Sequence, residues 1–242
     1  MKLALILRGH ERDTFLNSRL YDFIKRFSSD FPVDIFIHTW SSSIGEICWR
    51  PLSIIARPIT ETTLQEYFKD IPIKHVIIDD EQKIELFGPT DGNVSMGPCP
   101  RIAWKRMWYG KHKIIEHIMN SGVVYDFLMN IRFDVFQNSN NIFTEDAIIE
   151  RTKDLVKMEV VNHIYFMKEN PCAGIDNCYF GSIPAIYKLC HSFHLSLSAI
   201  ETEYKTVFYT EFLVFFKALD INYKTWFFLM RATPNITRLK IK

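Results

Sequence analysis

Two charged residues, Arg132 and Asp134, stand at the end of the apolar stretch YDFLMNIRFDVF (125–136). Strand interiors exclude charge unless it is paired, so these side chains need either each other or a ligand. Positions i and i+2 of a strand share one face, so the two residues could form an ion pair without a ligand. Alternatively, a carboxylate at a strand end suits Mg²⁺ or Mn²⁺, which prefer oxygen ligands, and an arginine suits phosphate. The spacing alone leaves both interpretations open.

Three other predicted strands also end in residues that could hold a charged ligand. In chain order these residues are Arg8, Gly9, His10 and Arg12, then His38, Thr39 and Trp40, then Asp79, Asp80 and Glu81. Ligands of open α/β sheets bind beyond the carboxyl ends of the strands, so we expect these groups to share one rim. Arginines bind phosphate, a ring can stack on a base, and acids accept hydrogen bonds from ribose hydroxyls or bind metal. The rim therefore predicts a site for a nucleoside diphosphate.

Each of these residues also has a purely structural interpretation. Arg8 and Arg12 could pair with surface acids, and His38 and Trp40 could be core side chains. The first predicted strand is not followed by a G-x-G-x-x-G sequence, and the chain has no Walker A sequence. A dinucleotide-binding Rossmann site and a P-loop are therefore not predicted.

Two acidic residues later in the chain could act as a general base. Asp176 lies in the glycine-containing stretch NPCAGIDNCYFGS (170–182), and Glu211 opens the apolar stretch TEFLVFF (210–216). A carboxylate at either position could accept the proton of a sugar hydroxyl. The alternatives are an Asx-turn at Asp176 and a favourable charge at a helix N-terminus for Glu211.

The apolar pattern predicts an α/β fold that would position these residues. Apolar runs indicate strands over 2–9, 33–40, 73–81 and 125–136, and shorter ones over 164–167 and 177–182. Helical spacing indicates helices over 13–27, 60–70, 101–122, 144–156, 184–197 and 210–220. We expect Asp13 to be the N-cap of the first helix and Gly122 to be the C′ glycine of the third. In that third helix, Trp104, Met107 and Trp108 are expected to be buried, with Lys105, Arg106 and Lys111 in solvent.

Composition narrows the class of protein. The 242 residues carry a net charge of +1, which argues against a nucleic-acid-binding protein. The first apolar run is too short for a signal peptide, and no apolar run is long enough to span a membrane. The five cysteines are an odd number without a C-x-x-C pair, so we expect reduced thiols and a cytoplasmic location.

The order of these motifs resembles a known family. The matching segments are RGHERDTF (8–15), DIFIHTW (34–40), MWYGKHKIIEHI (107–118), IRFDV (131–135), IDNCYFGSIPAIYKL (175–189) and TEFLVFF (210–216). They are similar to a group of small glycosyltransferases from bacteria and large DNA viruses, and the similarity spans nearly the whole chain. The resemblance implies a GT-A-like fold, in which a single Rossmann-type domain has a mixed β-sheet flanked by helices. A viral origin would imply the host cytoplasm.

The resemblance also implies roles for individual residues. Transfer of a sugar from a nucleotide-diphosphate sugar to a glycan or glycoprotein acceptor is expected, with residues 1–138 binding the donor and 139–242 facing the acceptor. The donor-binding residues would be Arg8, Gly9, His10, Arg12, Thr39, Trp40, Asp79 and Arg132. Asp134 would bind Mn²⁺ or Mg²⁺, although position 132 is Arg where GT-A enzymes have the first Asp of their D-x-D motif, and Asp176 or Glu211 would be the catalytic base. The competing functions are a non-catalytic nucleotide- or carbohydrate-binding module and an S-adenosylmethionine methyltransferase.

Overall fold

The chain folds into a mixed β-sheet covered by helices. This computed structural model describes residues 1–47, 55–137, 144–157, 164–167, 177–221 and 226–228. The described residues form a seven-stranded sheet in the order β3-β2-β1-β4-β6-β5-β7. The strands are β1 (Leu3–Arg8), β2 (Val33–Trp40), β3 (Ile73–Asp79), β4 (Phe127–Arg132), β5 (Ile164–Met167), β6 (Cys178–Gly181) and β7 (Trp226–Phe228). The first four strands are parallel, whereas β6 runs antiparallel to both of its neighbours, β4 and β5.

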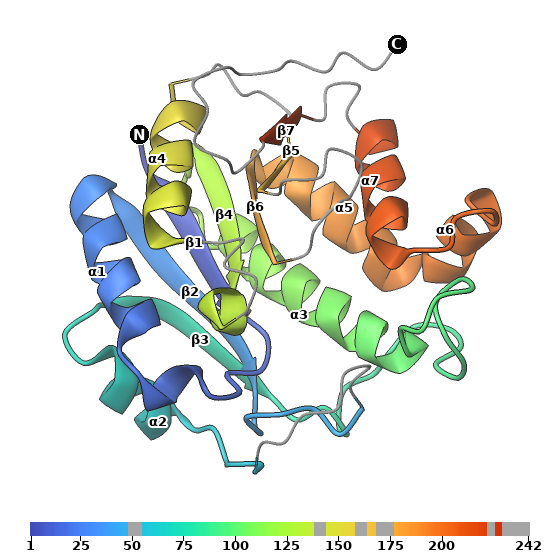
Figure 1. Cartoon of the computed structure of the whole chain (residues 1–242), viewed down its shortest axis with the longest axis horizontal. Helices are drawn as coiled ribbons and strands as arrows, with labels where there is room; N and C mark the ends of the chain where they lie inside the picture. Colours follow the sequence, from blue (N-terminus) through green and yellow to red (C-terminus); the bar gives the residue numbers. More distant parts are fainter. Residues whose placement is uncertain (48–54, 138–143, 158–163, 168–176, 222–225, 229–242) are drawn as a thin grey trace.

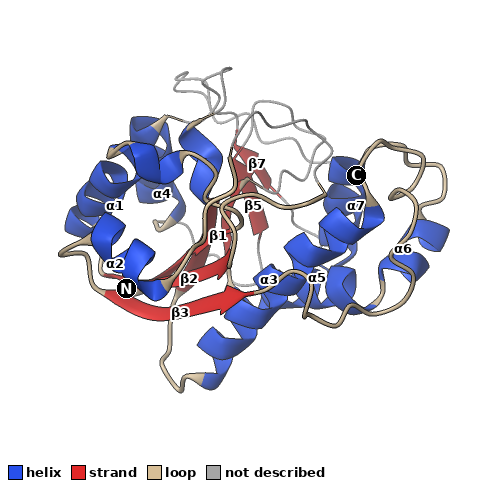
Figure 2. Cartoon of the chain, turned by 90° about the horizontal axis from the view of Figure 1, so that it is seen from below, coloured by secondary structure: helices blue, strands red, loops and turns tan. Residues whose placement is uncertain are grey.

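Helices cover both faces of this sheet. They are α1 (Arg19–Asp30), α2 (Glu61–Phe68), α3 (Arg101–Asn120), α4 (Glu145–Leu155), α5 (Ile183–Leu195), α6 (Leu197–Glu203) and α7 (Thr210–Ile221). Figure 1 and Figure 2 show α1, α2 and α4 on one face, with α3, α5, α6 and α7 on the other. The predicted α/β class with a mixed, helix-flanked sheet is therefore confirmed. None of the described helices has the length and apolar character needed to cross a membrane.

The central strand β1 separates two apolar cores. Its side chains at Leu3, Leu5 and Leu7 pack with α1, α2 and α4, whereas Ala4 and Ile6 pack with α3 and α5. Successive side chains of a strand point to opposite faces, so a strand buried on both faces must be apolar throughout. This is why LALILR reads as an uninterrupted apolar run up to its final arginine.

The first helix starts later than the sequence predicts. Thr14–Leu16 forms a short 3₁₀ helix, η1, and α1 begins at Arg19 with Ser18 as its N-cap. Asp13 is therefore not the N-cap of α1, and the extra turn widens the connection between β1 and α1. The predicted end of α3 is confirmed, because Gly122 follows its C-cap with φ +72°, a left-handed conformation that glycine adopts without strain.

The basic face of α3 was expected in solvent, and that expectation is wrong. Lys105, Arg106 and Lys111 are all buried. Lys105 donates a hydrogen bond to the Phe87 carbonyl, and Lys111 lies with its Nζ 3.6 Å from the centre of the Trp108 ring. Helical spacing identifies the face toward the sheet, but it does not show that α5 and the segment after β3 cover the remaining faces of α3.

At Gly110 of α3, even a methyl side chain is expected to clash with its surroundings. A Cβ added there would lie 2.4 Å from Cε1 and 2.5 Å from Nδ1 of His38, whose side chain is 1% exposed. Alanine is ordinarily favoured over glycine in a helix by about 1 kcal/mol. Overpacking a core costs about 1–3 kcal/mol. After the helical gain is subtracted, we expect Gly110→Ala to lower the free energy of unfolding in urea by up to about 2 kcal/mol.

The control is the same substitution in a His38→Ala background. Without the imidazole, the added methyl group has room, and Gly110→Ala should then be neutral or stabilising. Equal destabilisation in both backgrounds would show that the His38 contact is not the cause.

Candidate functional site at the carboxyl edge of β1 and β4

The strand order creates a topological switch point beside β1. The chain passes from β1 to β2 and β3 on one side, then returns to β4 on the other side of β1. Ligands of open α/β sheets bind beyond the carboxyl ends of the strands at such a point. The last residues of these two parallel strands, Arg8 and Arg132, are register partners. The carboxyl edge of β1 and β4 is therefore the candidate site.

Asp134 lies at the centre of a cluster of charged side chains on this edge. Its Oδ1 accepts a hydrogen bond from Arg132 Nε at 2.7 Å, and its Oδ2 accepts one from Arg132 Nη2 at 2.7 Å. Arg12 Nη1 donates to the same Oδ2. Arg132 Nη1 also donates to Asn177 Oδ1 at 3.0 Å, which ties the cluster to the start of β6. The carboxylate is buried, whereas the arginine side chains at 12 and 132 keep 20% and 25% of their surface exposed.

This geometry answers one question that the spacing left open. Arg132 and Asp134 do form an ion pair, and Arg12 joins it. The predicted strand over 125–136 is too long, however, because β4 ends at Arg132 and Asp134 lies in a 3₁₀ turn, η2 (Phe133–Phe136). The contact is therefore made by a turn that brings the carboxylate back toward Arg132, and not by a shared strand face.

The turn after β1 is held by buried hydrogen bonds. Arg8 is 3% exposed, and its Nε donates to Asn130 Oδ1 of β4 at 2.9 Å. Gly9 has φ +92°, and its carbonyl accepts a hydrogen bond from Thr39 Oγ1 at 2.9 Å. Arg12 also has a positive φ, +55°. Gly9 and the buried Thr39 thus shape the backbone that presents Arg12.

His10 and Trp40 belong to a second network beside the first. His10 Nε2 lies 3.0 Å from Glu81 Oε1, and its ring stacks on Trp40 with the centroids 5.9 Å apart. Trp40 is 3% exposed and also stacks on Tyr109. Arg106 Nη1 pairs with the other oxygen of Glu81 at 3.2 Å. Trp40 is therefore a buried ring between two aromatic neighbours, not an open platform for a base.

Asp79 is engaged by two donors at the end of β3. Its oxygens accept from Lys113 Nζ at 2.8 and 2.9 Å, and Oδ2 lies 3.1 Å from His38 Nε2. Burial pushes the pKa of Asp79 upward, but the hydrogen bonds from His38 and Lys113 outweigh it and lower the pKa to about 2. Burial also lowers the pKa of His38, so the imidazole is neutral and donates from Nε2. This triad joins β2, β3 and α3.

The residues around Asp134 do not fit a divalent metal ion. Both carboxylate oxygens accept from guanidinium groups, and Asn177 Oδ1 accepts from Arg132. Mg²⁺ and Mn²⁺ need several oxygen ligands, and two adjacent arginines would repel a cation. Within the described ranges, no group of three or more His, Cys, Asp or Glu side chains could hold a metal ion. Positive charge at this edge comes from arginine.

Of the two predicted catalytic carboxylates, only Glu211 is among the described residues, and no described contact joins it to the Asp134 cluster. Asp176 lies outside the described residues. Glu211 stands in the first turn of α7, where its Oε2 accepts a hydrogen bond from Thr210 Oγ1 at 3.1 Å. Among the described contacts, none joins Glu211 to Asp134 or to the arginines.

Sequence reasoning missed two buried polar groups that support the edge. Asn130 binds Arg8, and its presence inside the apolar run FLMNIR was a signal that could have identified it. Glu11 is buried, with Oε1 2.6 Å from Arg57 Nη2 and Oε2 accepting from the Phe15 amide at 3.2 Å. Burial raises the pKa of Glu11, although the hydrogen bond from Arg57 opposes it. Glu11 and Arg57 are 46 residues apart in the chain, so only the folded structure shows that they form a pair.

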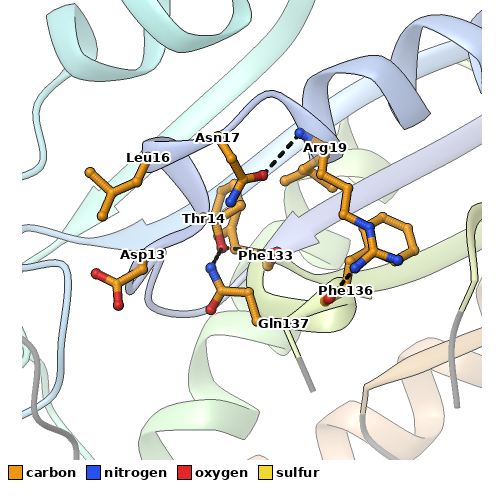
Figure 3. Close-up of a pocket in the computed structure, with 9 residues that line it drawn as sticks. Asp13, Thr14, Leu16, Asn17, Arg19, Phe133, Phe136 and Gln137 are labelled. Atoms are coloured by element: carbon orange, nitrogen blue, oxygen red, sulfur yellow. Dashed lines mark hydrogen bonds between the residues drawn. The ribbon is translucent and has the colours of Figure 1, made fainter. Parts of the chain in front are cut away.

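A cavity of about 520 Å³ lies near the Asp134 cluster, and its lining residues are drawn in Figure 3. It lies between η1 with the start of α1 and η2, and we call it the η1–η2 cavity. Its lining residues are Asp13, Thr14, Leu16, Asn17, Arg19, Leu20, Phe133, Phe136 and Gln137. Thr14 Oγ1 donates to the Phe133 carbonyl at 3.1 Å and accepts from Gln137 Nε2 at 3.0 Å. Arg12 and Asp134 are the chain neighbours of two lining residues, Asp13 and Phe133, so the cavity lies next to the segments that carry the cluster.

Comparison with known proteins does not identify a family for this chain. A scan of the sequence against protein-family models finds no match, and a search of curated proteins finds no significant match. The function must therefore be argued from the carboxyl edge itself and from the motifs in the sequence.

Proposed function

We propose that the chain transfers a sugar from a nucleotide-diphosphate sugar to a glycan or protein-linked acceptor, with the diphosphate bound at the carboxyl edge of β1 and β4. The observation that carries the proposal is the convergence of Arg8, Arg12 and Arg132 at the topological switch point. Arg12 and Arg132 meet at Asp134, and Arg8 is the register partner of Arg132 on the neighbouring strand. Guanidinium groups at a switch point suit an anionic ligand such as a diphosphate.

The cluster has a role in the proposed reaction. Guanidinium groups recognise phosphate oxygens with paired hydrogen bonds, and they stabilise the charge that grows on a departing diphosphate. Asp134 would act as a positioning residue, because its carboxylate fixes the orientation of both Arg12 and Arg132. The sugar chemistry is supported by the motif resemblance, with which the α/β sheet is compatible.

A donor panel tests this proposal. UDP-, GDP- and dTDP-sugars would each be added to the protein in a thermal-shift assay, with and without Mn²⁺. We expect sugars of one nucleotide class to raise the melting temperature, and slow hydrolysis of that donor to release the nucleoside diphosphate.

Two outcomes would contradict the transferase. Stabilisation by S-adenosylmethionine and by none of the nucleotide sugars would indicate a methyltransferase. Donor binding without hydrolysis, unchanged in Asp176→Asn and Glu211→Gln variants, would indicate a binding module instead.

A further inference from the structure

The η1–η2 cavity offers complementary hydrogen-bonding groups around an apolar floor. The Asp13 carboxylate and Gln137 Oε1 can only accept hydrogen bonds. Asn17 accepts from the Arg19 amide through Oδ1 at 3.0 Å, so its Nδ2 is oriented as a donor (Figure 3). Leu16, which is 68% exposed, forms an apolar rim. The volume of the η1–η2 cavity, about 520 Å³, is in the range of small-molecule sites.

Its charges disfavour an anionic occupant. Arg19 is the cation of the lining, and its guanidinium pairs with both oxygens of Glu145 and donates to the Phe136 carbonyl at 2.6 Å. Asp13, whose Oδ1 lies 3.7 Å from Arg57 Nη2, contributes negative charge. A phosphate in this cavity would meet the Asp13 carboxylate and a single arginine, whereas three arginines lie at the carboxyl edge of β1 and β4.

Its rings disfavour a stacked base. Phe133 and Phe136 are buried side chains, and Phe133 meets Phe15 edge-on with the centroids 5.6 Å apart. The Arg19 guanidinium carbon lies 5.2 Å from the centre of the Phe136 ring and covers its face (Figure 3). Neither ring offers a face to a planar ligand.

We propose that the η1–η2 cavity binds a neutral saccharide unit. Hydroxyl groups both donate and accept, so a sugar can satisfy Asp13, Asn17 and Gln137 together, while its C–H groups lie against the exposed Leu16. Because the cavity lies near the Arg12–Asp134 cluster, the sugar is the acceptor residue of the transfer reaction. The acceptor role rests on the proposed function, whereas the binding of a saccharide does not.

The test is ligand-observed NMR with the full chain. The probes are methyl α- and β-glycosides of glucose, galactose, mannose and N-acetylglucosamine, with uridine, guanosine, thymidine and inorganic phosphate as competitors. We expect saturation transfer to at least one glycoside and no displacement by the competitors. Asn17→Asp keeps the oxygen that accepts from the Arg19 amide but removes the donor, and should weaken binding at least about fivefold, the loss of one hydrogen bond. Leu16→Trp, at an exposed position, should fill the cavity and abolish binding.

The matched control is Gln65→Glu on the exposed surface of α2, which makes the same amide-to-carboxylate change away from the cavity and should leave binding unchanged. The proposal is overturned if no glycoside binds, if a nucleoside or phosphate displaces the glycoside, or if Asn17→Asp and Leu16→Trp bind as the unaltered protein does. Failure of the donor panel together with glycoside binding would refute the transferase and keep the saccharide site. Donor binding and hydrolysis without glycoside binding would refute the saccharide site and leave the transferase proposal standing.

Discussion

An Arg132→Gln variant should bind its nucleoside diphosphate about 10- to 100-fold more weakly than the unaltered protein, because a charge-assisted hydrogen bond contributes about 1.5–3 kcal/mol. Arg132 ends β4 at the switch point, and its guanidinium is held by both oxygens of Asp134 and by Asn177. Glutamine keeps a donor for these partners but removes the charge that a diphosphate requires. Isothermal titration with UDP, GDP and dTDP measures the loss.

The control for this substitution is Arg26→Gln. Arg26 pairs with Asp146 between α1 and α4, with 57% of its side chain exposed, so the same loss of charge occurs away from the candidate site. This variant should bind as the unaltered protein does. Equal affinities for Arg132→Gln and the unaltered protein would remove Arg132 from the diphosphate site.

The same titration distinguishes arginine from metal as the source of positive charge. Since Asp134 already accepts from Arg12 and Arg132, we expect EDTA to leave the affinity for the nucleoside diphosphate unchanged. Binding that disappears in EDTA and returns with Mn²⁺ would mean that the carboxylate exchanges its arginines for a metal ion when the ligand arrives.

The class of fold, and the edge of the sheet at which the candidate site lies, could be predicted because they depend on local patterns. Parallel strands buried on both faces must be apolar, so β1 and β2 are recognisable as runs that stop at polar residues. The carboxyl ends of such strands meet at one edge, and this rule alone directs attention to Arg8 and Arg132. Their pairing in register was then a consequence of the strand order.

The contacts inside the site depend on residues that are distant in the chain. Arg12 reaches Asp134 across 122 positions, and the turn that carries Asp134 begins where the apolar run still continues. A pattern of apolar residues cannot distinguish strand from 3₁₀ turn at its last few positions. The η1–η2 cavity likewise exists only because an extra turn after Asp13 lies against η2.

The burial of individual side chains was the least predictable property. Trp40 could equally have been exposed on the rim, and Lys105 could equally have been in solvent, because each is decided by a segment that packs from elsewhere. For Trp40 this segment is Tyr109 of α3, and for Lys105 it is the loop that carries Phe87. Amphipathic spacing describes one face of one element, so it does not show which other segments of the chain cover the remaining faces.

The second large expected effect is acid destabilisation through two buried histidines between α3 and α5, His112 and His194. His112 Nε2 lies 3.1 Å from His191 Nδ1, and the rings of His112 and His194 stack with their centroids 4.8 Å apart. Burial, followed by the charges of His112, His191 and Lys105, lowers the pKa of His194 to about 4. Burial also lowers the pKa of His112, and Glu116 opposes it.

The direction of the pH effect follows from these lowered values. An unfolded histidine takes up its proton near pH 6.5, whereas folded His194 resists protonation down to about pH 4. Stability is therefore fully present above pH 6.5 and declines as the pH falls from 6.5 to 4, by about 3 kcal/mol for His194. Urea unfolding at a series of pH values measures this decline.

A His194→Gln variant should lose most of that dependence, because its neutral amide does not titrate between pH 6.5 and 4. Its stability at pH 7 will be lower, since the ring contacts with His112, Tyr109 and Phe87 are lost, but the decline on acidification should be shallower. Tyr187→Phe is the matched control, because it keeps a ring on His112 and leaves all three imidazoles in place. If His194→Gln and Tyr187→Phe decline as steeply as the unaltered protein, the acid sensitivity arises elsewhere in the fold.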